Sequence, residues 1–400
     1  MTREELQQRE RQRKREERRR QKEAWEAARG PLDLPFLMLV MILLAIGLIM
    51  LLSASFPSAQ ADGDAFYYIK RQVFFAALGV FAMFSVGKIN YQRFRGVATL
   101  ALIVSAVLLF LVIIPGIGIK SHNARRWLGL PGTEFRFQPS ELAKLGIIVY
   151  FAADIAKKRE KMRTFREGIL PYLIILGIAT LFMLLEPHLS GAILLLGIGA
   201  MMMVVGGIHE KWIALGVGGI LGGGYLVLYT DLMEKIGYNS HRILTWKDPF
   251  WDAQNLSYQM AQSFITIGSG GLLGVGLGKS RQKFMFLPEE HNDFIFAVVC
   301  EELGLVGATL IMVLFALLII RGYWLAIHAR DRFGSLLVVG VITQIALQTF
   351  LNIAVVTGLI PATGISLPFF SYGGTALAIQ LAEMGIVLSV SRQIPAPKGG

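Results

Sequence analysis

Cysteine is almost absent from this chain of 400 residues, since Cys300 is the only one. A lone cysteine has no partner within the chain, so it excludes a disulfide framework and a cysteine metal site. The histidines form no H-E-x-x-H motif, which is the spacing that helical zinc proteases use. The sequence therefore does not indicate redox chemistry or a His/Cys metal centre.

Motifs that bind nucleotides are missing as well. The stretch GVGLGKS, residues 274–280, resembles a phosphate-binding loop, but the first glycine of that motif would have to stand at residue 273, where the chain has Leu273. An acidic D-x-D triplet occurs once, at residues 62–64 between the first two apolar runs, with no further acidic residue or histidine beside it to hold the metal of a sugar nucleotide. Neither an ATP site nor a sugar-nucleotide donor is indicated.

Long apolar runs are what the chain has in abundance. Hydrophobic residues make up 54% of it, and its mean hydropathy is +0.55. A helix needs about 20 mainly apolar residues to cross a bilayer. Hydropathy predicts an all-α polytopic membrane protein with about ten transmembrane helices, at residues 33–54, 72–88, 95–115, 139–156, 168–185, 191–207, 213–229, 293–320, 334–356 and 372–390.

Basic residues predict how these helices are oriented. With the N-terminus inside, 26 of the 39 Lys and Arg residues fall in cytoplasmic segments and 12 in outside loops, while Lys144 lies within a span. Because cytoplasmic loops carry the excess of Lys and Arg, both termini are expected in the cytoplasm. The same rule explains the net charge of +11, so no nucleic-acid partner is expected.

Three regions follow from this topology. Residues 1–32 form a charged cytoplasmic tail, helical or disordered, which contacts anionic lipid or a cytoplasmic partner, or is simply solvated. The tail is too long and too acidic for a signal peptide, so the first span is expected to be retained. Residues 33–392 form the membrane domain, and residues 393–400 a short cytoplasmic tail.

Two outside loops are long enough to carry function. The first covers residues 116–138, and the second, residues 230–292, is the large extracytoplasmic loop between spans seven and eight. Within the second loop, Tyr258 to Ile267 is apolar at helical spacing and predicts a short helix against the membrane face. No internal repeat typical of an inverted-repeat transporter is visible.

The strongest candidate for chemistry is Asp293, at the mouth of span eight in LPEEHNDFIF. A carboxylate at the membrane rim can take a proton from a sugar hydroxyl or hold a divalent cation such as Mg²⁺ or Mn²⁺. The alternative is that Asn292 or Asp293 only caps the following helix. Glu289 precedes it in the same acidic stretch.

A second group of candidates lies around the start of span four, in FQPSELAKL. Pro139 suits a first helical turn, and Glu141 and Lys144 share one helix face at a spacing of three residues. A self-compensating ion pair is the alternative to a functional role. The preceding loop carries three cations and an aromatic ring that could bind a pyrophosphate and an isoprenoid chain: Lys120, Arg125, Arg126 and Trp127. For Trp127, anchoring at the membrane interface is an equally good explanation.

Further ionisable residues stand at membrane depth, where such groups are functional candidates. Glu186 and His188 occupy the turn between spans five and six. Glu301 and Glu302 lie about 12 Å below Asp293 at 1.5 Å per residue. We expect them to form structural ion pairs with partners elsewhere in the bundle.

These motifs together resemble the SEDS (shape, elongation, division, sporulation) family, whose members include RodA, FtsW and SpoVE. The resemblance runs from about residue 33 to residue 392. It rests on ARRWLGL, FQPSELAK, EPHLSG, RILTWKDPFWDAQNLSYQMAQS, IGSGGLLGVGLGKSRQKFMFLPEEHNDFIFAVVCEELGLVG and NIAVVTGLIPATGISLPFFSYGGT. His188 departs from the family's usual aspartate, and Asn292, Ala253 and Ser257 depart from its usual threonine, proline and glycine.

The resemblance implies a ten-span peptidoglycan glycosyltransferase in the bacterial cytoplasmic membrane that polymerises lipid II on its outer face. It also implies a class B penicillin-binding transpeptidase and other division proteins as partners. EPHLSG and FFSYGGT lie nearer to division or sporulation members than to elongation members.

By the same resemblance, Asp293 matches the aspartate of glycosyl transfer. The residues expected to bind the substrate or its pyrophosphate are Glu141, Lys144, Arg126, Trp127, Lys120, Gln138 and Glu289. A lipid II transporter and a non-catalytic division scaffold are the alternatives from other classes.

Overall fold

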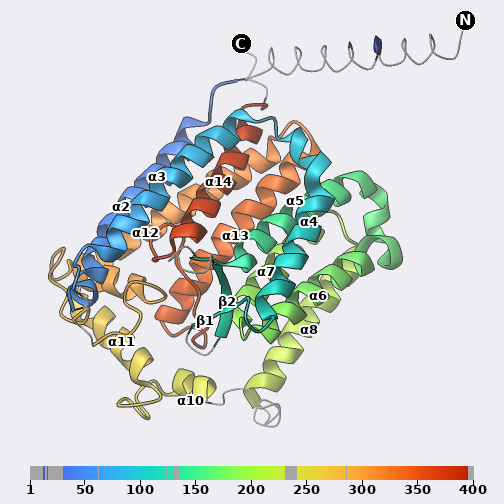
Figure 1. Cartoon of the computed structure of the whole chain (residues 1–400). Helices are drawn as coiled ribbons and strands as arrows, with labels where there is room; N and C mark the ends of the chain where they lie inside the picture. Colours follow the sequence, from blue (N-terminus) through green and yellow to red (C-terminus); the bar gives the residue numbers. More distant parts are fainter. Residues whose placement is uncertain are drawn as a thin grey trace, which may run out of the picture.

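The computed structural model is a bundle of long helices, with a small sheet and two short helices gathered at one end (Figure 1). It describes residues 12–13, 16, 30–61, 63–121, 124–129, 136–229, 241–284 and 286–394. Most of the charged tail and residues 395–400 lie outside this part of the chain, as does the segment 230–240.

Each predicted span overlaps a helix of the bundle. The helices are α2 (Leu34–Ala61), α3 (Tyr67–Lys88), α4 (Gln92–Ile113), α5 (Pro139–Lys158), α6 (Leu170–Leu185), α7 (Leu189–Val205), α8 (Glu210–Tyr229), α12 (Ile295–Ile327), α13 (Arg332–Val356) and α14 (Gly374–Ser391). Within the described residues, seven are long and apolar enough to cross a membrane, α6 being counted with the turn before it. Of the others, α7 has 17 residues, and α5 carries charges at both ends.

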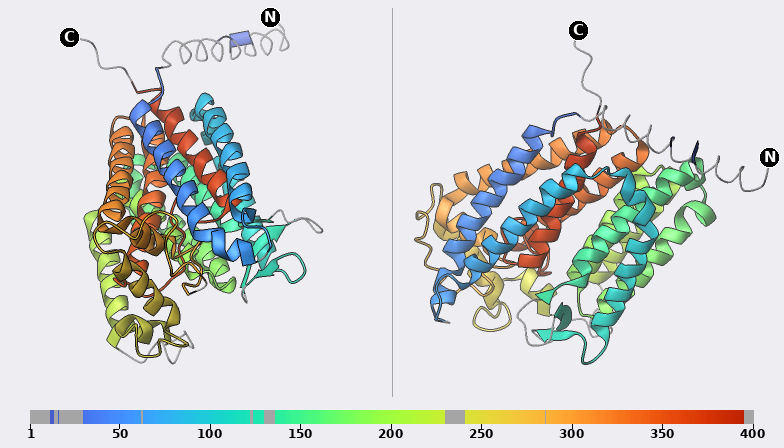
Figure 2. Two further views of the ribbon diagram at one scale, coloured as in Figure 1. Left: turned by 90° about the vertical axis from the view of Figure 1, so that its left-hand side faces the viewer. Right: turned by 45° about the horizontal axis from the view of Figure 1, so that its top comes forward.

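The centre of the bundle is built on α13 and α14, whose apolar windows are each 72% buried. Figure 2 shows α3 lying along α14. A Cβ added at Gly79 would lie 2.7 Å from Leu381 Cδ1, and one at Gly385 would lie 2.5 Å from Met83 O. Glycine at these positions therefore lets α3 and α14 approach closely, as small residues do between membrane helices.

Both ends of the described chain lie at the same end of the bundle. The backbone N–H of Gly30 donates to Arg392 O at 2.8 Å, and the amide of Asp33 donates to Ser391 Oγ at 3.4 Å. The sheet, α10 (His241–Lys247) and α11 (Tyr258–Gly270) lie at the opposite end (Figure 1). The predicted helix at Tyr258–Ile267 is confirmed as α11.

The described part of the predicted loop 116–138 contains a small sheet, which the all-α prediction did not include. Three short antiparallel strands form there in the order β1 (Ile119–Ser121), β2 (Ala124–Gly129) and β3 (Arg136–Phe137). The chain leaves α4 and enters α5 at the same end of the bundle, and pairing between the strands satisfies backbone N–H and C=O groups of the segment that joins them.

The second long loop returns onto a break in α12. Gly304 interrupts that helix with φ 67° and ψ −173°, and the loop backbone replaces the missing helical bonds. Val275 N donates to Glu301 O at 2.9 Å, and Gly276 N donates to Glu302 O at 3.0 Å. The loop before Asp293 is thereby fixed to the helix that follows it.

Side chains strengthen the same attachment and confirm the expected structural ion pair at Glu302, whereas Glu301 is held by hydrogen bonds instead. Lys283 Nζ lies 2.8 Å from Glu302 Oε1 and also donates to Ser53 Oγ of α2 at 2.9 Å. Glu301 accepts a hydrogen bond from the hydroxyl of Ser280. The partners come from distant parts of the sequence, which is why the sequence alone does not name them.

Candidate functional site

Asp293 lies one residue outside the cap of α12. The residue that caps the helix is Phe294, with no hydrogen bond from a side chain, and the side chain of Asn292 donates to Glu289 Oε2 at 2.6 Å. The alternative that Asn292 or Asp293 serves as a helix cap is therefore wrong. The carboxylate of Asp293 is thus not used to cap α12.

The backbone around Asp293 is fixed by the segment that follows α13. Asn352 of α13 donates from Nδ2 to Asp293 O at 2.8 Å and to Ile365 O at 2.6 Å. Ser371 donates to Asn292 O at 2.7 Å. These bonds connect the mouth of α12 to the loop between α13 and α14, so two distant parts of the sequence position the carboxylate together.

The electrostatic surroundings of Asp293 favour a base that titrates near neutrality. Its pKa is raised to about 6, mainly by burial and also by the neighbouring Glu289, while Arg126 and His291 oppose the rise. At pH 7 the side chain is therefore mostly ionised and able to accept a proton.

Arg126 comes from β2 and links Asp293 to the turn between α6 and α7. Its Nη2 donates to Pro187 O, and its charge acts on both Asp293 and Glu186. Because side chains alternate along a strand, Trp127 points to the opposite face of β2. The structure thus brings Arg126 to Asp293 but shows no contact between Trp127 and Asp293 among the described residues.

Glu186 is the least satisfied group at this site. Its side chain is 1% exposed, and neither carboxylate oxygen has a hydrogen-bond partner within the described residues. Its pKa is raised to about 8 by burial, although the charge of Arg126 opposes the rise. Buried polar groups without partners are rare in folded proteins and call for an explanation.

His188 follows two residues later and faces α5. Gln138 Nε2 lies 3.2 Å from His188 Nδ1. The pKa of His188 is lowered to about 3, mainly by burial and also by the nearby charges of Arg126 and Lys144. The imidazole is therefore neutral and serves as a hydrogen-bonding group, at a position where an aspartate is usual in the family that the sequence resembles.

Glu141 and Lys144 form the predicted ion pair, at 2.8 Å, with the Lys144 side chain 1% exposed. Glu383 of α14 lies within electrostatic reach of both and accepts a hydrogen bond from Gln344 Nε2 at 2.9 Å. Sequence reasoning missed Glu383, although a carboxylate inside an apolar span is a signal that could have found it.

The predicted residues therefore divide into two groups. A connected set joins the mouth of α12 to the start of α5: Asp293, Glu289, Arg126, Gln138, Lys144 and Glu141. Lys120 lies in β1 opposite Arg125, and its side chain falls outside what the structure describes. No described contact ties Trp127 to this set.

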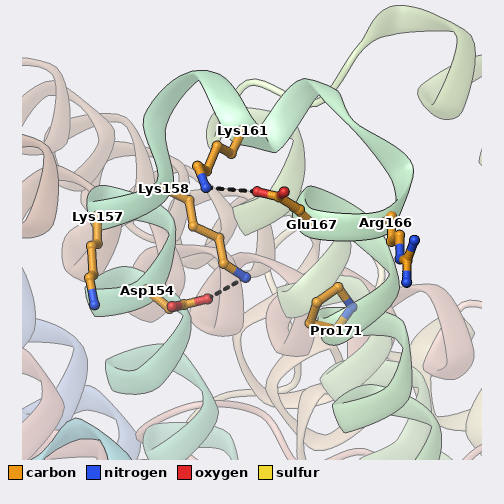
Figure 3. Close-up of a pocket in the computed structure, with 7 residues that line it drawn as sticks. All are labelled: Asp154, Lys157, Lys158, Lys161, Arg166, Glu167 and Pro171. Atoms are coloured by element: carbon orange, nitrogen blue, oxygen red, sulfur yellow. Dashed lines mark ion pairs between the residues drawn. The ribbon is translucent and has the colours of Figure 1, made fainter.

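The described residues contain no group of three His, Cys, Asp or Glu side chains able to hold a metal ion. A cavity of about 460 Å³ is lined by Asp154, Lys157, Lys158, Lys161, Arg166, Glu167 and Pro171 (Figure 3). It lies at the far end of α5 from the Asp293 site.

The fold and the site together define a polytopic helical membrane protein with a carboxylate and a guanidinium set at one end of its bundle. A model of the FtsW/RodA/SpoVE family, described as cell cycle proteins, matches residues 34–395. The chain belongs to this family.

Curated relatives agree with that assignment. Stage V sporulation protein E of Bacillus subtilis is 41% identical over 362 residues, covering 90% of this chain and 97% of that protein. A protein of Geobacter metallireducens, named a probable peptidoglycan glycosyltransferase FtsW, is 40% identical over 90% of this chain and 95% of its own length.

Solved structures share the fold. A chain of a peptidoglycan synthase complex, described as coordinating polymerization and crosslinking, has a TM-score of 0.75 at 28% identity, covering 90% of this chain and 98% of that chain. The rod shape determining protein RodA of Thermus thermophilus has a TM-score of 0.66 at 27% identity, over 92% and 99% of the two chains.

Proposed function

We propose that this chain is a peptidoglycan glycosyltransferase that polymerises lipid II at the outer face of the bacterial cytoplasmic membrane, in septal or spore cell-wall synthesis. The observation that carries the proposal is the carboxylate of Asp293, which caps no helix and lies within electrostatic reach of Arg126. Membership of the FtsW/RodA/SpoVE family and the names of the relatives support it.

The proposed topology has ten spans, both termini in the cytoplasm, and tails at residues 1–32 and 393–400. Helices at all ten predicted spans support this count. So does the position of Gly30 beside Arg392, because an even number of crossings returns the chain to the side where it began. The loops 116–138 and 230–292 and the Asp293 site then face outside.

In the proposed reaction, the 4-hydroxyl oxygen of the acceptor sugar attacks C1 of the donor sugar. The bond from C1 to the pyrophosphate oxygen breaks with inversion, and undecaprenyl pyrophosphate leaves. Asp293 accepts the proton of the attacking hydroxyl. Arg126 and Lys144, with Lys120 on the rim, stabilise the negative charge that develops on the leaving group.

The remaining predicted residues bind the substrate in this proposal. Glu141 holds the ammonium of Lys144 in place, and Gln138 is oriented through His188. Trp127 offers an amphipathic ring at headgroup depth for the lipid carrier, and Glu289 borders Asp293.

A divalent cation, Mg²⁺ or Mn²⁺, that bridges Asp293 and the substrate pyrophosphate stays a prediction. The described side chains supply too few ligands to hold such an ion alone, so substrate phosphates would have to complete its coordination. No step above depends on it.

The proposed partner is a class B penicillin-binding transpeptidase, with other division membrane proteins around it and lipids surrounding the helices. The support is the similarity to a chain of a synthase complex that couples polymerization with crosslinking. The product strand made at the outer face would then reach the crosslinking partner directly.

One observation favours a rival function, a transporter that flips lipid II between leaflets. Glu383 lies about 14 Å into α14 at 1.5 Å per residue, fully buried and close to Lys144. Transporters place essential charge near the bilayer midplane. A non-catalytic scaffold is the remaining alternative.

Purified protein with its cognate transpeptidase, supplied with lipid II, separates the three functions. Glycan polymer without any nucleotide is expected for the glycosyltransferase. Movement of labelled lipid II across a vesicle membrane without polymer would support the transporter, and binding of the transpeptidase with neither activity would support the scaffold.

A further inference from the structure

The cavity at the far end of α5 has the chemistry of an anion-binding site. Its lining carries four cationic side chains and two carboxylates. Lys158 is paired with Asp154 at 2.8 Å, and Lys161 with Glu167 at 2.9 Å. Because both carboxylates are already paired with lysines, the other two cations leave the lining with an excess of positive charge.

Lys157 and Arg166 supply that excess. Both are exposed, and the described residues show no salt bridge for either, although Arg166 lies within electrostatic reach of Glu167, which Lys161 pairs. Figure 3 shows them on the two flanks of the Lys158–Asp154 pair, with Pro171 between. Both side chains line a cavity of about 460 Å³, and each can donate charge-assisted hydrogen bonds to phosphate oxygens.

The walls of the cavity are held by more than the ion pairs. The hydroxyl of Tyr172 donates to Asp154 Oδ2 at 2.7 Å, and the ammonium of Lys158 lies 4.7 Å from the centre of the Tyr172 ring. The end of α5 and the start of α6 are thereby fixed to each other, so the two flanking cations belong to a preformed cavity.

An apolar surface leads away from this cavity along α6. Leu170, Ile174, Ile178 and Leu181 are 36%, 52%, 48% and 55% exposed, and their spacing places them on one face of the helix. This helix is among the candidate membrane spans. A ligand with a phosphate at one end and acyl chains at the other fits both surfaces, whereas a free phosphate would use only the cavity.

We propose that this cavity binds the head group of an anionic phospholipid, with the acyl chains lying against α6. The site is separate from the proposed reaction site, because the cavity lies at the end of α5 and Gln138 at its start, about 30 Å away for a helix of 20 residues.

The test is lipid binding to the full-length protein, measured by native mass spectrometry with phosphatidylglycerol and phosphatidylcholine as probes. The variant K157Q/R166Q is compared with K88Q/R93Q, which removes two charges from the connection between α3 and α4. We expect the cavity variant to bind phosphatidylglycerol on the order of thirtyfold more weakly, at about fivefold for each charge.

The control variant should bind phosphatidylglycerol as the unmodified protein does. Equal losses in both variants would overturn the proposal in favour of general attraction to basic loops. Equal binding of phosphatidylcholine would also overturn it. Displacement of the lipid by millimolar inorganic phosphate would show that the cavity recognises a free anion instead.

Discussion

The backbone of Gly364 lies directly against the carboxylate of Asp293. A Cβ added at Gly364 would stand 3.0 Å from Asp293 Oδ2, and the residue has φ +69°. The loop between α13 and α14 therefore forms a wall of the proposed site that only glycine fits.

Gly364→Ala should lower glycan polymerisation at least tenfold while the helical bundle stays folded. The added methyl group displaces the carboxylate, and the left-handed backbone costs about 1–3 kcal/mol. Gly177→Ala is the control, because a Cβ there meets nothing within 4 Å. Equal activity in the two variants would show that the wall does not position Asp293.

The ion pair between Lys283 and Glu302 should matter for stability. Their side chains are 4% and 0% exposed, and removal of one partner from a buried pair costs about 3–5 kcal/mol. Lys283→Met should therefore lower the Tm in detergent clearly. The double variant K283M/E302Q removes both charges of the pair and should recover most of the loss; no recovery would contradict a role as a balanced pair.

The pH dependence of polymerisation should report Asp293. Its pKa is raised to about 6, and only the ionised form accepts a proton, so kcat/KM should fall as the pH drops through about 6. Arg126 lowers this pKa; Arg126→Gln should therefore move the acidic limb to higher pH, and Arg126→Lys should move it less. A limb that stays in place would mean that another group titrates.

Glu186 offers a test of function against stability. A buried carboxyl group without partners costs about 1–3 kcal/mol, so Glu186→Met should keep or raise the Tm. We expect the same variant to lose polymerisation at least tenfold, because an apolar side chain replaces the carboxyl group within electrostatic reach of Arg126. Unchanged activity with a raised Tm would show that the carboxyl group has no part in the reaction.

Much of the fold can be predicted from local sequence, because a long apolar run in a bilayer has few alternatives to a transmembrane helix. The ten predicted spans overlap helices, and α11 and the Glu141–Lys144 pair lie where expected. The sheet at residues 119–137 was not predicted, since it depends on where α4 and α5 place the ends of the segment.

The site was predictable in its residue types but not in its contacts. Asp293 and Arg126 stand out as charges at the membrane rim. Their proximity depends on β2 and on the attachment of the loop to α12. The role of Asn352 in holding Asp293 O joins residues 59 positions apart, and a single sequence gives no information on such a contact.

The most direct measurement is lipid II polymerisation by the purified protein with its transpeptidase, comparing the unmodified chain with Asp293→Asn and Asp293→Ala at equal protein levels. Glu290→Gln is the neighbouring control, since Glu290 is engaged by Ser58. We predict polymer from the unmodified chain and the control, and a loss of about 10²–10⁴-fold or more in both Asp293 variants at unchanged Tm. Full polymerisation by either Asp293 variant would contradict the proposal that this carboxylate is the base.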